Sequence, residues 1–178
     1  KSIAEPAMQA KLKALAMTPN PMSAASFGEM IVADQQLWAR VVQQGKLLGC
    51  TEVLFSLGDK PEAIYPEMKS FLNERGHQRT LDYLYEACRV VLEETGLLPH
   101  SNPGVMGQGD LQRLRDVNPS MGLMLESVSE RLLIAGGAHE DAPDKKPAVR
   151  LRTLETAGKL RVPFTTGILI GIGENWQE

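Results

Sequence analysis

Four groups of polar residues follow short apolar stretches of this chain. They are the candidates for binding or catalysis. The groups are Gly58–Pro61, His100–Asn102, Glu126–Ser127 and Gly171–Glu174. Carboxylates can hold an amino group or ribose hydroxyls, a lysine can meet a carboxylate, and glycines let a flat base approach the backbone. We interpret the set as a site for a polar small molecule. The alternative is that loops after strands are simply polar.

The apolar stretches alternate with helical patterns. We predict strands near residues 52–57, 97–101, 120–126 and 163–170, and helices over 30–48, 65–76, 80–96, 109–117 and 148–160. Thr80 is the expected N-cap of the longest helix, and Gly96 its end. This alternation predicts an α/β fold with parallel strands and right-handed crossovers, whose ligands bind at the carboxyl ends of the strands. Alternation alone does not distinguish an open sheet from an arc of a barrel.

Composition narrows the class of protein. The chain has 178 residues, of which 43% are hydrophobic and 23% charged, with a net charge of −3. These values are typical of one globular domain and give no reason to expect nucleic acid as a partner. Because no apolar run approaches the roughly 20 residues that cross a bilayer, we expect no transmembrane segment. We expect a soluble protein of the cytoplasm or of an organelle interior, with the chloroplast stroma as one option.

Five stretches, in order, resemble the radical S-adenosylmethionine domain of FO synthase. They are LGCTEVLFSLGDKPE, EETGLLPHSNPGV, SMGLMLESVSERL, APDKKPAVRLRTLE and VPFTTGILIGIGE. That family joins tyrosine to 5-amino-6-ribitylaminouracil and so makes the deazaflavin precursor. The resemblance covers about Ala33 to Glu178. It implies a partial, half β/α barrel with about four parallel strands and outer helices over residues 31–178, preceded by an irregular extension over residues 1–30.

The resemblance also assigns roles to the polar groups. Gly58, Asp59, Lys60 and Pro61 match the segment that receives the methionyl amino group of the nucleoside. Glu126 and Ser127 match the contacts to ribose or to methionyl polar groups, and Arg150 or Arg152 would meet the methionyl carboxylate. Gly167, Gly171, Gly173 and Glu174 fit the pattern G-x-I-x-G-x-x-E beside the adenine, with Leu169 at the isoleucine position. His100 and Asn102 lie where substrate contacts are expected.

The family's radical chemistry needs a four-iron cluster held by three thiolates of a C-x-x-x-C-x-x-C loop. This chain has two cysteines, and the matching region, MTPNPMSAASFGEM, contains none. Cys50 precedes a strand and so belongs at the opposite rim, whereas Cys88 reads as a small buried hydrophobe within a helix. We therefore expect no cofactor in this chain, although S-adenosylmethionine and a 4Fe-4S cluster belong to the family.

Two interpretations follow. In the first, the chain is not catalytic by itself and serves as a structural or binding subunit. In the second, it is a fragment of an active FO synthase. Four strands cannot close a barrel, so we expect other protein subunits to cover its edges and an apolar inner face built from Leu54, Leu123, Leu125 and Leu169 or their neighbours. His77 reads as a surface turn residue, and His139 either as a solvated loop residue or as a residue that reaches the rim.

Overall fold

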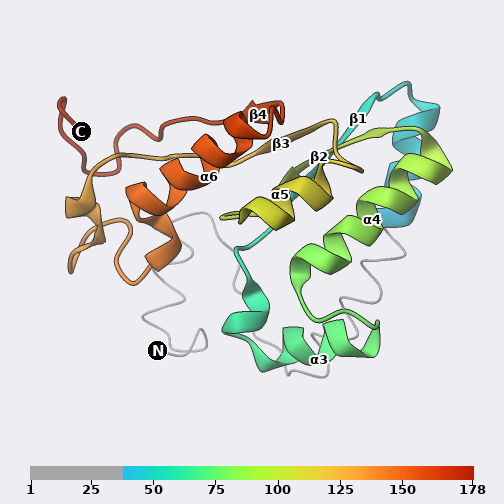
Figure 1. Cartoon of the computed structure of the whole chain (residues 1–178), viewed down its shortest axis with the longest axis horizontal. Coiled ribbons are helices and arrows are strands. Elements are labelled where there is room, and N and C mark those ends of the chain that lie inside the picture. The colour runs from blue at the N-terminus through green and yellow to red at the C-terminus, as the bar shows by residue number, and fades with distance from the viewer. Residues whose placement is uncertain (1–37) are drawn as a thin grey trace, which may run out of the picture. The chain divides into compact units, whose positions relative to one another are not determined.

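Four short strands form one parallel sheet in the order of the sequence, β1-β2-β3-β4 (Figure 1). The strands are β1 (Glu52–Ser56), β2 (Leu98–Asn102), β3 (Ser120–Gly122) and β4 (Phe164–Thr165). Each strand pairs in parallel with the next one along the chain. The α/β fold with four adjacent parallel strands is confirmed, and an open sheet of this order is consistent with part of a barrel.

The computed structural model describes residues 38–178. The expected extension over residues 1–30 and the first part of the helix expected over 30–48 lie outside the described residues. Residues 38–47 are helical, and residues from Val41 to the end of the chain form one compact unit. No helix in this described part is long and apolar enough to cross a membrane.

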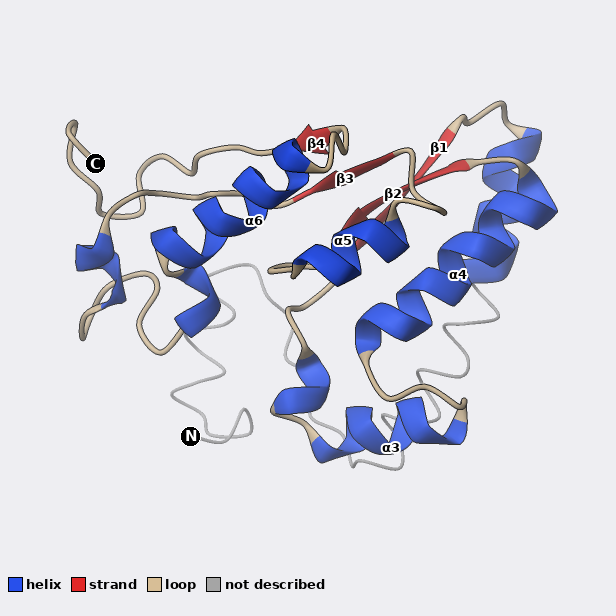
Figure 2. Ribbon diagram, in the orientation of Figure 1, coloured by secondary structure: helices blue, strands red, loops and turns tan. Residues whose placement is uncertain are grey.

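The helices follow the predicted spacing closely. They are α3 (Pro66–Glu74), α4 (Thr80–Thr95), α5 (Gln108–Leu114) and α6 (Pro147–Lys159). Three single turns of 3-10 helix lie in the loops: η1 (Pro61–Ala63), η2 (Glu130–Leu133) and η3 (Pro143–Lys145). Figure 2 shows α4, α5 and α6 along one face of the sheet. This single helical layer is the outer layer expected of a barrel arc.

The hydrophobic core lies between these helices and the sheet. Leu84, Leu111, Leu114 and Met121 are buried there, each at most 2% exposed, and Phe55 packs against them. Because successive strand residues point to opposite faces, Met121 and Phe55 face the helices while their neighbours face the inner side. The core therefore packs the helices against one face of the sheet. The residues at the carboxyl ends of the strands lie next to the loops.

A buried polar group joins α4, β2 and the segment before β3. The hydroxyl of Ser101 donates to Asn118 Oδ1 at 2.6 Å, and the Asn118 amide donates to the Leu114 carbonyl at 3.0 Å. The Cys88 thiol lies within 3.4 Å of the Ser101 hydroxyl. Cys88 is fully buried, as expected of a small core residue, and its burial raises the pKa of the thiol.

The start of α4 corrects one prediction. The N-cap position is Arg79, and Thr80 is the first helical residue. Instead of capping with its own side chain, Thr80 donates both its backbone N–H and its hydroxyl to the Glu62 carboxylate, at 3.1 and 2.6 Å. A carboxylate from another segment satisfies the free N–H at the positive end of the helix dipole. The predicted end of α4 is confirmed, since Gly96 adopts a φ of 72°.

The strands β3 and β4 are shorter than predicted, because a bulge interrupts their pairing. Three residues separate Gly122 from Glu126, but only two separate their partners Thr165 and Ile168. The extra residue on the β3 side breaks the ladder, and the Leu125 N–H donates to the Thr166 hydroxyl instead of to a carbonyl. Bulges near binding sites change the direction of a side chain, which here is Glu126.

The inner face is less apolar than predicted. Leu54 and Leu98 are 62% and 44% exposed on it, and Leu169 is also exposed, whereas Leu123 is buried at 1%. Towards the carboxyl ends the face becomes polar, with His100 bonded to Ser120 through Nδ1 at 2.7 Å. The apolar inner face expected from the sequence is therefore present at Leu54, Leu98 and Leu169 and is interrupted by the polar pair of His100 and Ser120.

Asn118→Ala tests the buried polar group. The substitution removes the acceptor of the buried Ser101 hydroxyl, which keeps only the weak Cys88 thiol, and one of the two donors to the Leu114 carbonyl, so the free energy of unfolding should fall by about 1–3 kcal/mol. Chemical denaturation of the full chain measures the change. Asn73→Ala, at an exposed position of α3, is the matched control and should change it by less than about 0.5 kcal/mol. Equal effects of the two substitutions would contradict the assignment.

Candidate functional site

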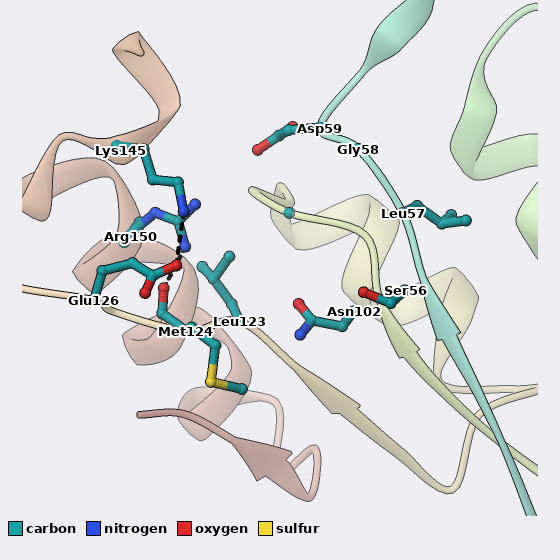
Figure 3. Close-up of a pocket in the computed structure, with 11 residues that line it drawn as sticks. Ser56, Leu57, Gly58, Asp59, Asn102, Leu123, Met124, Glu126, Lys145 and Arg150 are labelled. Atoms are coloured by element: carbon teal, nitrogen blue, oxygen red, sulfur yellow. Dashed lines mark hydrogen bonds and ion pairs between the residues drawn. The ribbon is translucent and has the colours of Figure 1, made fainter. Parts of the chain in front are cut away.

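A cavity of about 340 Å³ lies at the carboxyl ends of β1, β2 and β3 (Figure 3). Its walls come from the loops after these strands and from the start of α6. The lining residues are Ser56, Leu57, Gly58, Asp59, Asn102, Gly104, Leu123, Met124, Glu126, Lys145 and Arg150. Five of the residues singled out in the sequence therefore meet at one place: Gly58, Asp59, Asn102, Glu126 and Arg150.

Asp59 is held against the loop that follows β2. Its Oδ2 accepts the backbone N–H of Val105 at 2.8 Å. The close contact between Asp59 and this loop requires a glycine at position 104, because a Cβ there would lie 2.4 Å from the Asp59 carboxyl group. Gly104 also has a φ of 87°, a conformation that favours glycine. The second oxygen, Oδ1, is buried and accepts no hydrogen bond from the described residues. Its charged neighbour is the Lys60 ammonium, 3.0 Å away.

Lys60 links this loop to the segment before α6. Its ammonium lies 3.0 Å from Asp59 Oδ1, as an ion pair without hydrogen-bond geometry, and donates to Asp144 Oδ1 at 3.4 Å. Burial alone would lower the pKa of Lys60, but the two carboxylates outweigh it and the pKa is raised. Lys60 also adopts a left-handed φ of 44°, which is uncommon for a residue with a side chain.

Glu126 reaches the cavity from the bulge after β3. Its φ is 68°, and its Oε1 accepts the Lys145 ammonium at 2.7 Å. The left-handed conformation and the irregular pairing together turn the carboxylate out of the ladder and into the cavity. Figure 3 shows this pair across the cavity from Asp59. A carboxylate so fixed can accept hydroxyl groups of a ligand through its remaining lone pairs.

Arg150 forms the inner wall beside this pair. It is 5% exposed, its Nε donates to the Asp144 carbonyl at 3.0 Å, and Nη1 donates to the Met124 carbonyl. Burial lowers the pKa of Arg150 from its usual value, although Glu126, Asp59 and Asp144 act against that change. A guanidinium remains charged in proteins. The remaining N–H groups can therefore meet a carboxylate within the cavity.

The other residues singled out in the sequence lie outside the cavity lining. The Ser127 hydroxyl is used locally, as it accepts the Ser129 N–H at 3.0 Å. Arg152 is exposed on α6, and the Glu174 carboxylate accepts the N–H groups of Gly171 and Ile172 at 2.6 and 2.9 Å, which lowers its pKa. His100 lies on the inner face of β2, two residues before Asn102.

Three residues of the site were missed by the sequence reasoning. Lys145 and Asp144 belong to a stretch, EDAPDKK, that reads as a solvated loop, and Gly104 was not singled out. The available signal was the pair Pro143 and Pro147, which brackets two lysines just before a helix. His139, in the same loop, is 7% exposed and therefore buried instead of solvated. His77 lies between α3 and α4, as predicted.

The cysteines lie apart. Cys50 is exposed just before β1, at the opposite rim from the cavity, and Cys88 is buried in α4. Within residues 38–178, no group of three or more His, Cys, Asp or Glu side chains is arranged to hold a metal ion. The donor set of these residues therefore does not fit a cluster that needs three thiolates.

Comparison with known proteins finds relatives of this sequence among the FO synthases. The chain is 52% identical over 138 residues to the 7,8-didemethyl-8-hydroxy-5-deazariboflavin synthase of Methanopyrus kandleri, which covers 78% of this chain and 41% of that protein. It is 50% identical over 161 residues to the FO synthase of Nocardia farcinica, or 90% of this chain and 18% of that protein. It is 53% identical over 139 residues to the FO synthase of Mycobacterium tuberculosis, and the match covers 78% of this chain and 16% of that protein.

No family model and no solved structure matches the chain. The chain spans about two fifths of the length of the first of these relatives and less than a fifth of the other two. Identity near 50% across most of the chain nevertheless far exceeds what fold similarity alone produces. Over the segment that they share, this chain is homologous to the FO synthases.

Proposed function

We propose that this chain is the nucleoside-binding part of an FO-synthase-like radical S-adenosylmethionine barrel, that it is not catalytic by itself, and that it works as a binding or structural subunit of a larger assembly. One observation carries the proposal. The strand-end cavity brings Asp59, Glu126 and Arg150 together in a homologue of the FO synthases.

The three side chains match the polar groups of S-adenosylmethionine. The Asp59 carboxylate suits the methionyl ammonium, which would share its Oδ1 with the Lys60 ammonium, 3.0 Å away. Arg150 suits the methionyl carboxylate, and Glu126, turned inward by its left-handed backbone, suits the ribose hydroxyls. Gly167, Gly171 and Gly173 extend along the segment after β4, where the adenine would lie with Leu169.

The cluster does not fit these 178 residues, because two cysteines cannot supply three thiolates. Without iron to chelate the methionyl amine and carboxylate, the nucleoside is held by the protein groups alone, and we expect weak binding. The second candidate is that these residues are part of an active FO synthase that joins tyrosine to 5-amino-6-ribitylaminouracil. The identity of 50–53% to the synthases favours it, and it requires thiolates from another chain or segment.

The partner is a protein that closes the barrel. In the described sheet, β1 and β4 each have one edge without a neighbouring strand. Leu54 and Leu98 leave the amino-terminal half of the inner face apolar and exposed. Unpaired edges and exposed apolar faces are both routes to association. A specific partner should therefore bury more than roughly 1,000 Å² of total surface.

Nucleoside binding tests the site. Calorimetry should give S-adenosylmethionine a Kd above roughly 100 μM, and weaker binding to 5′-methylthioadenosine, which lacks the amino-acid part. Asp59→Asn removes the charge opposite the ammonium and should bring the two nucleosides to similar affinities. Asp116→Asn, at an exposed residue, should leave the difference unchanged. Submicromolar binding would contradict the weak site, and no binding at about 10 mM would contradict the site altogether.

Iron reconstitution tests the proposed lack of catalysis. The chain, incubated anaerobically with iron and sulfide and then desalted, should hold no stoichiometric iron and show no charge-transfer band near roughly 400 nm. Cys50→Ser should behave like the unchanged chain. A four-iron spectrum that depends on either cysteine would overturn the proposal and favour the active-synthase candidate.

Association tests the partner. Native mass spectrometry of the isolated chain should show self-association, because Leu54 and Leu98 of the inner face are exposed among residues 38–178. Leu54→Lys places a charge on that face and should increase the monomer fraction severalfold, whereas Ile64→Lys, at a position beside η1 that is 71% exposed against 62% for Leu54, should not. A stable monomer with cooperative unfolding would rule out an uncovered apolar face.

A further inference from the structure

A second cavity, of about 320 Å³, lies on the loop between η2 and η3. Its lining residues are Leu133, His139, Asp141, Ala142, Pro143 and Lys146. None of these six residues lines the strand-end cavity. The two cavities are nevertheless adjacent in the chain, because η3 contributes Pro143 to the second cavity and Lys145 to the first.

His139 is the unusual member of this lining. It is 7% exposed, yet its imidazole takes part in no hydrogen bond within the part of the chain that the structure describes. Its backbone N–H donates to the Leu132 carbonyl at 2.9 Å, and its carbonyl accepts the Ala142 N–H at 3.1 Å, so the main chain at His139 is held in place beside the cavity. Neither ring nitrogen is among the fully buried polar atoms without a partner, so the exposed remainder of the imidazole meets solvent at the cavity wall. A ligand in the adjoining cavity would supply the missing partner.

The electrostatic surroundings indicate the sign of the ligand's charge. Burial lowers the pKa of His139. The positive charges of Lys145 and Arg150 lower this pKa further, whereas the negative charge of Glu126 raises it. The imidazole is therefore neutral at pH 7, with one N–H to donate, and more positive than negative charge faces it. Lys146 brings a further ammonium to the wall, and Asp141 one carboxylate. A single negative charge on the ligand is favoured over two, because Asp141 repels a second.

We propose that this cavity binds a small organic carboxylate, which accepts hydrogen bonds from His139 and Lys146 and rests its apolar part on Leu133 and Pro143. The site is separate from the proposed nucleoside site and does not depend on it. Leu133, Ala142 and Pro143 give the wall an apolar half, which inorganic anions would not use. The proposal assigns a role to a loop that the nucleoside site uses only through Lys145 and Asp144.

The chain contains three histidines, and they make the test direct. The imidazole C–H resonances of His139, His100 and His77 report on the second cavity, on the inner face of the sheet and on a remote turn. The full chain is titrated with benzoate, with the isosteric neutral benzamide and with inorganic phosphate. Benzoate should shift the His139 resonance saturably, with little change at His77. Benzamide and phosphate should bind at least roughly tenfold more weakly, as expected when a charge-assisted hydrogen bond or the apolar contact is lost.

Substitutions at exposed positions keep the fold intact and sharpen the result. Lys146→Met should weaken benzoate roughly tenfold, whereas Lys159→Met, at the far end of α6, should not. Asp141→Asn should strengthen it. His139→Gln, followed through the Ala142 amide, should abolish the saturable shift. If His139→Gln does not fold, Lys146→Met carries the test.

Three results would overturn the proposal: no saturable shift at His139, equal shifts with benzoate and benzamide, or an effect of Lys159→Met equal to that of Lys146→Met. S-adenosylmethionine is titrated in parallel. A shift of His100 without a shift of His139 supports the nucleoside site alone, and the reverse supports the second site alone. The two proposals can therefore fail independently.

Discussion

The site depends on the contact between the Asp59 carboxylate and the loop after β2. Only a glycine at position 104 leaves room for that carboxylate, and the Val105 N–H then fixes one of its oxygens at 2.8 Å. The contact brings the loops after two neighbouring strands together and leaves the other oxygen of Asp59 beside the Lys60 ammonium, 3.0 Å away. Lys60, bound to Asp144, extends the same connection to the loop before α6. Three loops that are distant in the sequence are thereby held around one space.

Charge balance explains why this arrangement is tolerated at low exposure. Lys60 lies between Asp59 and Asp144, and Lys145 lies against Glu126. Arg150 is the exception, because its guanidinium donates to backbone carbonyls of Asp144 and Met124 instead of to a carboxylate. Burying an unpaired charge is costly, so the nearby carboxylates and the two carbonyls together keep Arg150 in place. A ligand carboxylate would complete its partners.

The fold was largely predictable, because apolar stretches of strand length alternate with helical patterns that end at glycines such as Gly96. The boundaries of β3 and β4 were not, since a bulge depends on tertiary pairing and leaves no periodic signal at Glu126. The N-terminus of α4 was missed for a similar reason: the carboxylate of Glu62, eighteen residues away, does what Thr80 was expected to do. Local patterns cannot reveal a cap that comes from another segment.

Within the site, acidic and basic residues directly after strands were predictable from position, as Asp59 and Glu126 show. Lys145 was not, because its relevance depends on η3 folding back over the end of β3, which the sequence pattern of a polar loop does not indicate. In the same loop His139 is buried, and two cavities with different lining residues lie on either side of η3 in the sequence. The sequence pattern alone does not indicate either cavity. Two prolines, Pro143 and Pro147, restrict the backbone on either side of this turn. This short polar loop therefore lines both cavities, the first through Lys145 and the second through Lys146.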